Sequence, residues 1–203
     1  MSDLVKIKKE VNEQLADPET LRSLVATTFK GLELSLLKRA VMEGMMRGFQ
    51  FKDFLEKNVY AIPFKGGYSL VTSVDYARKI GMRSGVVGKS EPRFEEKDGK
   101  IISCTITIKR KVNDYVGDYT ATVYFDEYTT GRNLWTTKPR TMISKVAEMH
   151  ALRMACPEEL AQSYVEEEVQ KEVTLELPES KIGEYEVKLR GVKNLEELKV
   201  VWS

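Results

Sequence analysis

Basic and aromatic side chains gather between residues 109 and 153, where they could bind a polyanion. The stretch contains Lys109, Lys111, Arg132, Trp135, Lys138, Lys145 and Arg153. Lysine and arginine neutralise phosphates without reading bases, and an aromatic ring can stack on a base of a single strand. We therefore interpret these residues as the walls of one basic groove. Arg78, Lys79 and Arg83 could extend it, although a charged face in contact with water alone explains them equally simply. Trp135 has a second interpretation, because a tryptophan just before a helix also closes a core.

Carboxylates in the same region could instead hold a divalent metal, as in a nuclease. Asp114, Asp118, Asp126 and Glu127 are close in sequence, and a metal bound there could activate water. However, adjacent residues at a strand end point in opposite directions, and Asp114 and Asp118 bracket an expected turn. His150 could act as a general base, but no nucleophile motif surrounds it. We favour a packed or hydrogen-bonded His150.

Charge is unevenly distributed along a chain whose formal net charge is +1. Lys+Arg against Asp+Glu count 8 against 7 in residues 1–50, 18 against 12 in residues 51–153, and 6 against 12 in residues 154–203. The middle is therefore +6 and the tail −6. A basic centre favours an anionic partner, although a charged face in contact with water alone gives the same count.

Several kinds of site and location are not expected. Cys104 and Cys156 have no paired spacing and no histidine cluster, which argues against a disulfide framework or a zinc site. Gly66-Gly67 lacks the helix and lysine of a phosphate loop. The N-terminus has no apolar signal-peptide run, and no window approaches about 18 apolar residues. We expect a soluble, cytoplasmic protein with no membrane partner.

The elements that would position these residues begin with helices. Asp17 and Pro18 end an initial charged helix, and an apolar stripe predicts a second helix over residues 19–46. These helices are too apolar to stand alone, so we expect them to pack on the main domain or on another subunit.

The pattern then changes to short strands. VYAIPF and YSLVTS flank Lys65-Gly66-Gly67 and predict a hairpin, and Ser73 can cap a helix over residues 74–83. A three-stranded meander is expected next, with strands over residues 91–97, 101–112 and 119–125 and turns at 98–99 and 113–118. In the middle strand, successive side chains alternate between a face that packs against the core and a polar face. The side chains expected on the core face are Ile102, Cys104, Ile106 and Ile108. Those on the polar face end in Lys109 and Lys111.

A helix is expected from Pro139 to just before Pro157. At helical spacing Lys138, Lys145 and Glu148 share one stripe, with Arg153 beside it. Glu148 could pair with Lys145 or with a neighbouring subunit. A further acidic helix is predicted over residues 157–172.

Two segments taken together resemble the RecT/Redβ family of phage single-strand annealing proteins. They are NVYAIPFKGGYSLVTSVDYARKIGMRSG and LWTTKPRTMISKVAEMHALRMACPEEL, and the resemblance covers roughly residues 30–170. Each motif alone is weak, but their order is specific.

The resemblance implies a recombinase, not an enzyme, that binds single-stranded DNA, anneals complementary strands without ATP and assembles as rings or helical filaments. Its implied partners are single-stranded DNA, the annealed duplex, a phage exonuclease and the host single-strand binding protein. No cofactor is implied, with magnesium only modulating DNA binding, and the setting is the cytoplasm of a bacterial host. The family's groove residues carry over onto Lys109, Lys111, Arg132, Lys138, Arg140, Lys145 and Arg153.

We therefore predict an α+β fold in which an antiparallel meander and a hairpin pack with helices. The expected parts are an N-terminal helical segment for subunit contacts (1–50), a DNA-binding core (51–170) and a short tail (171–203). Two other functions stay open: a metal-dependent nuclease, and a self-assembling structural protein whose basic groove binds an acidic neighbour.

Overall fold

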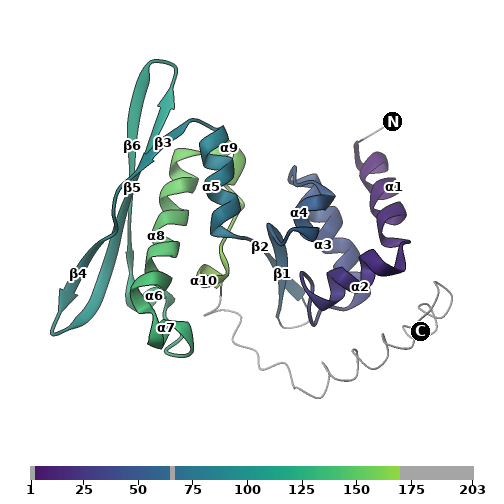
Figure 1. Cartoon of the computed structure of the whole chain (residues 1–203), viewed down its shortest axis with the longest axis horizontal. Coiled ribbons are helices and arrows are strands. Elements are labelled where there is room, and N and C mark those ends of the chain that lie inside the picture. The colour runs from purple at the N-terminus through teal and green to yellow at the C-terminus, as the bar shows by residue number, and fades with distance from the viewer. Residues whose placement is uncertain (1–2, 65–66, 170–203) are drawn as a thin grey trace. The chain divides into compact units, whose positions relative to one another are not determined.

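The protein combines helices with antiparallel strands, which confirms the predicted α+β class (Figure 1). The structure is a computed structural model that describes residues 3–64 and 67–169. The chain divides into two compact units, the first ending at Leu70 and the second beginning at Val71. This division falls within β2 (Gly67–Thr72). The functional parts 1–50, 51–170 and 171–203 stay a prediction.

The first unit is mostly helical. Before the division at Leu70 it contains α1 (Asp3–Leu15), α2 (Pro18–Ala26), α3 (Leu34–Met46), α4 (Phe51–Leu55) and β1 (Val59–Phe64), which pairs with β2. Asp17 begins α2, because its Oδ2 accepts a hydrogen bond of 2.8 Å from the Thr20 N–H. The glycine turn expected between β1 and β2 lies partly outside the described residues, at positions 65–66.

The single helix predicted over residues 19–46 is wrong, because the chain breaks between α2 and α3. α2 ends at Ala26, and Gly31 adopts a φ of 79°, which favours glycine, in the turn that precedes α3. On either side of Gly31, Phe29 and Leu32 turn into the core. The apolar stripe is therefore shared between two helices.

The first unit buries its apolar stripe within itself. Phe29 and Phe54 are fully buried and their ring centroids lie 5.7 Å apart. The Thr28 hydroxyl donates to the Phe54 carbonyl oxygen at 2.7 Å. A Cβ at Gly44 would lie 2.5 Å from Phe54 Cζ, so α3 approaches α4 closely only because Gly44 has no side chain. Contacts of these helices with another subunit stay a prediction.

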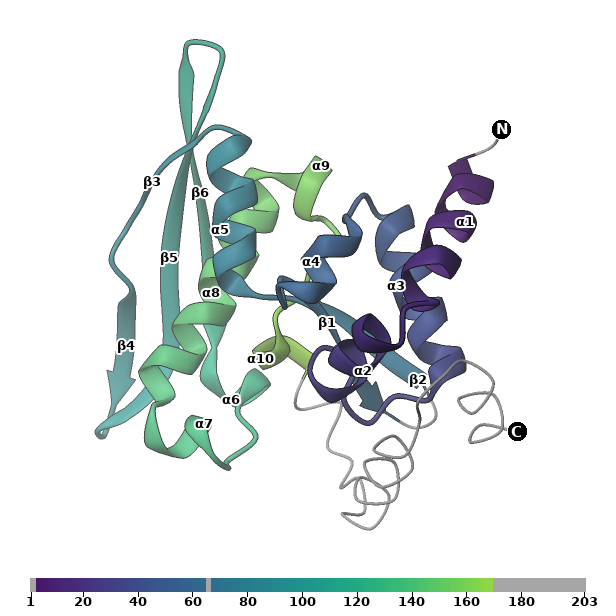
Figure 2. The same cartoon turned by 45° about the vertical axis from the view of Figure 1, so that its right-hand side comes forward.

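The second unit is a sheet covered by helices on one face (Figures 1 and 2). Its strands are β3 (Val86–Lys89), β4 (Arg93–Lys97), β5 (Lys100–Val112) and β6 (Tyr115–Tyr124). β5 pairs with β6 along one edge and with β3 and β4 in succession along the other, always antiparallel. The helices are α5 (Val74–Arg83), α6 (Phe125–Tyr128), α7 (Leu134–Thr137), α8 (Pro139–Ala155), α9 (Pro157–Leu160) and α10 (Glu166–Val169).

Local sequence signals place several of these elements as expected. The Ser73 Oγ accepts a hydrogen bond from the Tyr76 N–H at 3.2 Å and begins α5. Asp98 and Gly99 have φ angles of 52° and 74°, typical of the tight turn between β4 and β5. α8 begins at Pro139 and ends just before Pro157.

Three expectations for this unit need correction. β3 was not predicted, and the turn at residues 113–118 is only two residues long because Val112 pairs with Tyr115. The acidic helix over 157–172 is two short helices, α9 and α10, separated where Leu160 and Val165 enter the core. Residues 170–172 and the predicted tail lie outside the described residues.

If the first unit has its own core, Phe54→Ala should destabilise it by about 3–5 kcal/mol, because a fully buried ring is removed. Urea unfolding followed by circular dichroism measures this change. Leu55→Ala is the matched control: its side chain is 46% exposed, so the expected change is within about 0.5 kcal/mol. Equal effects of the two substitutions would contradict the described packing.

Candidate nucleic-acid interface

The sheet of the second unit leaves one face open, and two predicted cations lie on it. Ile106 and Ile108 point toward α8, so Lys109 and Lys111 point to the opposite side. Lys109 Nζ lies 3.4 Å from Asp118 Oδ1. Lys111 is exposed and forms no ion pair within the described part of the chain.

Four threonines form two pairs in the middle of this open face. The hydroxyl oxygens of Thr105 and Thr122 lie 2.8 Å apart, as do those of Thr107 and Thr120. Each pair spans β5 and β6 and uses one hydroxyl proton, which leaves the other hydroxyl free to donate. The middle of the face is therefore polar and capable of contacting phosphate or sugar oxygens. Val116, opposite Lys111, and Tyr124, opposite Ser103, are also exposed on this face.

The expected alternation along β5 changes at one end of the strand. Glu95 pairs with Ser103 and Glu96 with Ile101, so Ile102 is an extra residue in a bulge. Ile102 is consequently 37% exposed, while Ile101 packs against the core. Placing Ile102 on the core face was wrong, because the bulge shifts the alternation by one residue.

α8 lies against the other face of the sheet, so the predicted cations do not meet in one groove within the second unit (Figures 1 and 2). Lys109 and Lys111 are on the open face, whereas Lys145 and Arg153 project from a helix that covers the buried face. Two separate surfaces replace the single groove that the sequence suggested.

Lys145 and Arg153 are both paired with α10. Lys145 Nζ donates to Glu167 Oε1 at 2.7 Å. Arg153 donates to both carboxylate oxygens of Glu168, at 2.8 and 2.5 Å, and to the Ser163 carbonyl oxygen at 3.0 Å. These bonds fasten α10 to α8.

Glu168 collects several of these contacts. Besides Arg153, its Oε1 lies 2.9 Å from His150 Nε2, and Tyr128 Oη lies 3.1 Å from the same nitrogen. His150 is therefore packed and hydrogen-bonded, as the sequence suggested. Burial alone would raise the pKa of the Glu168 carboxyl, but the bonds from His150 and Arg153 outweigh burial and lower that pKa.

The remaining predicted cations lie near the start of α8. Arg132 is exposed in the loop before α7, and Lys138 is the exposed residue before Pro139. Neither side chain has an ion pair among the residues that the structure describes. Arg140 pairs with Glu96 and places its guanidinium carbon 4.9 Å from the centre of the Phe94 ring.

Trp135 lies in the core rather than on either surface. Its side chain is 3% exposed, and its ring meets that of Phe125 edge to face at 5.7 Å. This is the arrangement that the packing interpretation requires, and a base could not stack on the ring without rearrangement of α7.

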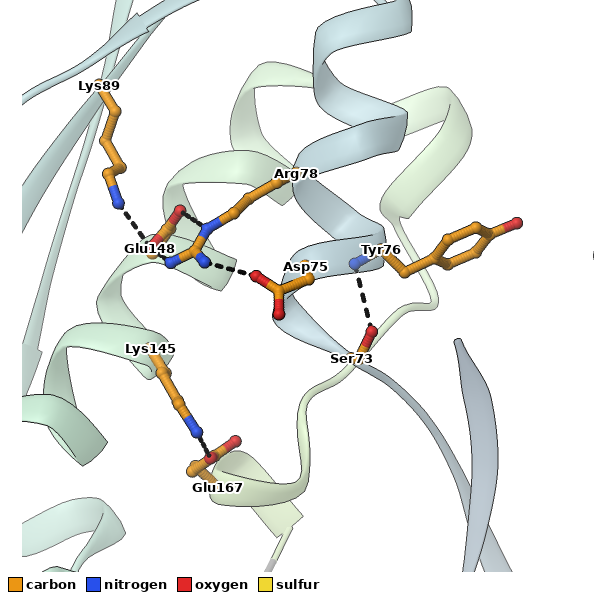
Figure 3. Close-up of polar contacts among 8 residues, drawn as sticks. All are labelled: Ser73, Asp75, Tyr76, Arg78, Lys89, Lys145, Glu148 and Glu167. Carbon is orange, nitrogen blue, oxygen red and sulfur yellow. Dashed lines mark hydrogen bonds and ion pairs between the residues drawn. The ribbon is translucent and has the colours of Figure 1, made fainter. Parts of the chain in front are cut away.

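Glu148 is the centre of a polar cluster that the sequence did not reveal (Figure 3). Its carboxylate accepts from Arg78 Nε at 2.6 Å, Arg78 Nη2 at 2.7 Å and Lys89 Nζ at 2.9 Å. Burial alone would raise the pKa of Glu148, but these hydrogen bonds outweigh it and lower the pKa. The suggested pairing with Lys145 is wrong, because Lys145 binds Glu167 instead.

Two of the cations that matter to this unit were missed. Lys89 lies on β3, which had no clear signal in the sequence. Arg110 lies on the core face, where Nε donates to the Ser84 carbonyl oxygen at 2.8 Å and Nη1 to the Ala155 carbonyl oxygen at 2.6 Å. Its position was detectable, since Arg110 follows Ile106 and Ile108 in the same alternation.

The carboxylates considered for a nuclease remain apart. Asp118 pairs with Lys109, and no three metal-binding side chains gather within residues 3–64 and 67–169. The same residues contain no helix long and apolar enough to cross a membrane.

Replacement of Trp135 by alanine should lower the free energy of unfolding by about 3–5 kcal/mol, because a large buried ring is removed. Trp135→Phe should cost less, and Leu134→Ala, at an exposed neighbour, should have little effect. Thermal melting and oligonucleotide titration on the same variants check this. An unaltered melt with weakened DNA binding in Trp135→Ala would instead place the ring against DNA.

Glu148 should also make stability depend on pH. Because its folded pKa is below the ordinary value of 4.5, its contribution is complete above that value and is lost as pH falls through the folded pKa. Glu148→Gln should cost about 3 kcal/mol at neutral pH, the lower end for a broken buried pair since Arg78 and Lys89 keep contact with water. The difference in the free energy of unfolding between wild type and variant should disappear as the carboxyl protonates. Urea unfolding at a series of pH values measures this difference. A difference that stays constant with pH would contradict the conclusion that Glu148 is ionised in the folded protein.

The sequence matches a known protein family and is similar to a protein of another organism. The sequence pattern of the RecT family matches residues 37–179, which is more than half of the chain. A protein of Ureaplasma parvum serovar 3, described as uncharacterized, is 28% identical over 153 residues, covering 72% of this chain and 69% of that protein. The chain therefore belongs to the RecT family, whose members anneal single strands in phage recombination.

Proposed function

We propose that this protein binds single-stranded DNA and anneals complementary strands without ATP. The observation that carries the proposal is the RecT family match over residues 37–179. The chemistry is sequence-independent, because cations that hold phosphates leave base edges free to find a complement.

The exposure of each acidic partner indicates which cations can leave that partner for a phosphate. Glu148, Glu167 and Glu168 have side chains only 4%, 11% and 5% exposed, so releasing their cations would leave poorly hydrated carboxylates. Asp118 and Glu96, at 58% and 36%, can return to water when a phosphate replaces them.

On this basis five cations make the first contacts with phosphate. Lys111, Arg132 and Lys138 have no ion pair to break within the described residues, and Lys109 and Arg140 have exposed partners. Lys145 and Arg153 act mainly by fastening α10 to α8. Trp135 supports binding indirectly, by packing beneath the residues that lead into α8.

The remaining features follow the family. We propose assembly as a homo-oligomer, in rings or helical filaments, in the cytoplasm of a bacterial host. A phage exonuclease and the host single-strand binding protein are the proposed protein partners. No cofactor is required under this proposal, and magnesium only modulates DNA binding by screening phosphates.

Annealing of labelled complementary oligonucleotides tests the function directly. The purified chain should accelerate duplex formation in the absence of ATP, and added ATP should leave the rate unchanged. Non-complementary strands control for aggregation. Duplex formation at the spontaneous rate, over a range of salt concentrations at which the protein is soluble, would overturn the proposal; cleavage of the strands with magnesium would indicate a nuclease.

The same oligonucleotides identify the lysines that bind phosphate. Lys109→Ala combined with Lys111→Ala should make the slope of log affinity against log salt less negative by about 0.7 for each phosphate that is no longer neutralised. Lys100→Ala, an exposed lysine at the other end of β5, is the control. If the slope equals that of the control, the open face of the sheet does not bind phosphate.

A further inference from the structure

Arg78 lies between two carboxylates that differ greatly in exposure (Figure 3). Nε and Nη2 donate to Glu148, whose side chain is 4% exposed, while Nη1 donates to Asp75 at 2.7 Å. The Asp75 side chain is 77% exposed. One edge of the guanidinium is therefore anchored in the protein, and the other faces a carboxylate in water.

Lys89 shares the same anchor. Its Nζ donates to Glu148 Oε2 at 2.9 Å, and its side chain is 37% exposed. An ammonium has more donors than this single bond uses, and the guanidinium of Arg78 also retains free N–H groups. Glu148 thus holds two cations, from α5 and β3, at one place on the surface with donors still available.

The charges match one further anion. Arg78 and Lys89 together exceed the single charge of Glu148 by one, and Asp75 balances that excess. Asp75 lies three residues before Arg78 on α5, and an exposed pair at this spacing is weak. A phosphodiester carries the same single charge, so it can replace Asp75 without leaving a buried group unpaired.

We propose that Arg78 and Lys89 form a phosphate-binding position for single-stranded DNA, that Glu148 positions both cations, and that Asp75 occupies Arg78 until a phosphate replaces it. This inference rests on the proposed function; the sequence offered Arg78 only as a possible extension of the groove, and the structure adds Lys89 and the shared partner Glu148. Glu148 does not touch DNA in this arrangement; it acts through its two partners.

A purely structural cluster and a phosphate position predict opposite results for Asp75→Asn. If Asp75 only steadies Arg78, its removal leaves DNA affinity unchanged or lower. If Asp75 competes with phosphate, affinity for an oligonucleotide should rise about twofold to fivefold. Asp98→Asn is the matched control, since it removes the same charge from an exposed turn elsewhere in the unit. A rise no larger than that of Asp98→Asn overturns the proposal.

Lys89 supplies the second measurement. Lys89→Gln should flatten the salt dependence of binding by about 0.7, while Lys89→Arg should restore it. Lys100→Gln is the control for charge, and melting of each variant shows whether the fold is retained. If Lys89→Gln melts like wild type and its slope of log affinity against log salt equals that of Lys100→Gln, the proposed phosphate position is contradicted.

Measurements on the wild-type protein test the proposed function separately from the proposed phosphate position. Wild-type protein that neither binds nor anneals oligonucleotides contradicts the proposed function. Wild-type binding that is unchanged by both Asp75→Asn and Lys89→Gln contradicts only the phosphate position at Arg78 and Lys89.

Discussion

The packing of α8 against β5 and β6 determines where charge can lie in the second unit. Cys104, Ile106 and Ile108 meet this helix from the sheet, and α5 covers part of another side. Gly81 allows that close approach, since a Cβ there would lie 3.0 Å from Leu152 Cδ2. A helix surrounded on several sides has little exposed surface, so its ionised residues need partners from the protein.

Glu148 shows the consequence most clearly. Its carboxylate cannot reach water freely, and two cations from α5 and β3 compensate for the missing hydration. Arg153 and Glu168 reproduce this arrangement about one and a half turns further along α8, with α10 as the second element. The acidic C-terminal part of the described chain thus binds the basic helix, and their opposite charges are complementary within one molecule.

Local signals in the sequence were sufficient for some individual elements but not for others, nor for their assembly. Ser73 and Pro139 specify helix starts through a side-chain hydrogen bond and a fixed φ, which depend only on neighbouring residues. β3 and the bulge at Ile102 depend on pairing with a distant strand, and nothing nearby encodes them. The candidate site shows the same limit, because spacing identified Lys145 as a cation of α8 but only tertiary contacts pair it with Glu167. Likewise, the sequence could not show that the sheet lies between Lys109 and Lys145.

A protein that anneals strands must hold DNA firmly enough to align it and loosely enough to let a complement be found. Cations paired with exposed acids suit this need, since the carboxylate regains water when phosphate arrives and returns when phosphate leaves. The free-energy difference between the cation paired with its carboxylate and the cation paired with phosphate is then small and depends on salt. Cations paired with buried acids cannot exchange in this way, because an unpaired carboxylate would remain inside. Under the proposed function, the exposure of the acid therefore distinguishes the cations that can exchange a carboxylate for a phosphate from those that cannot, within the described part of the second unit.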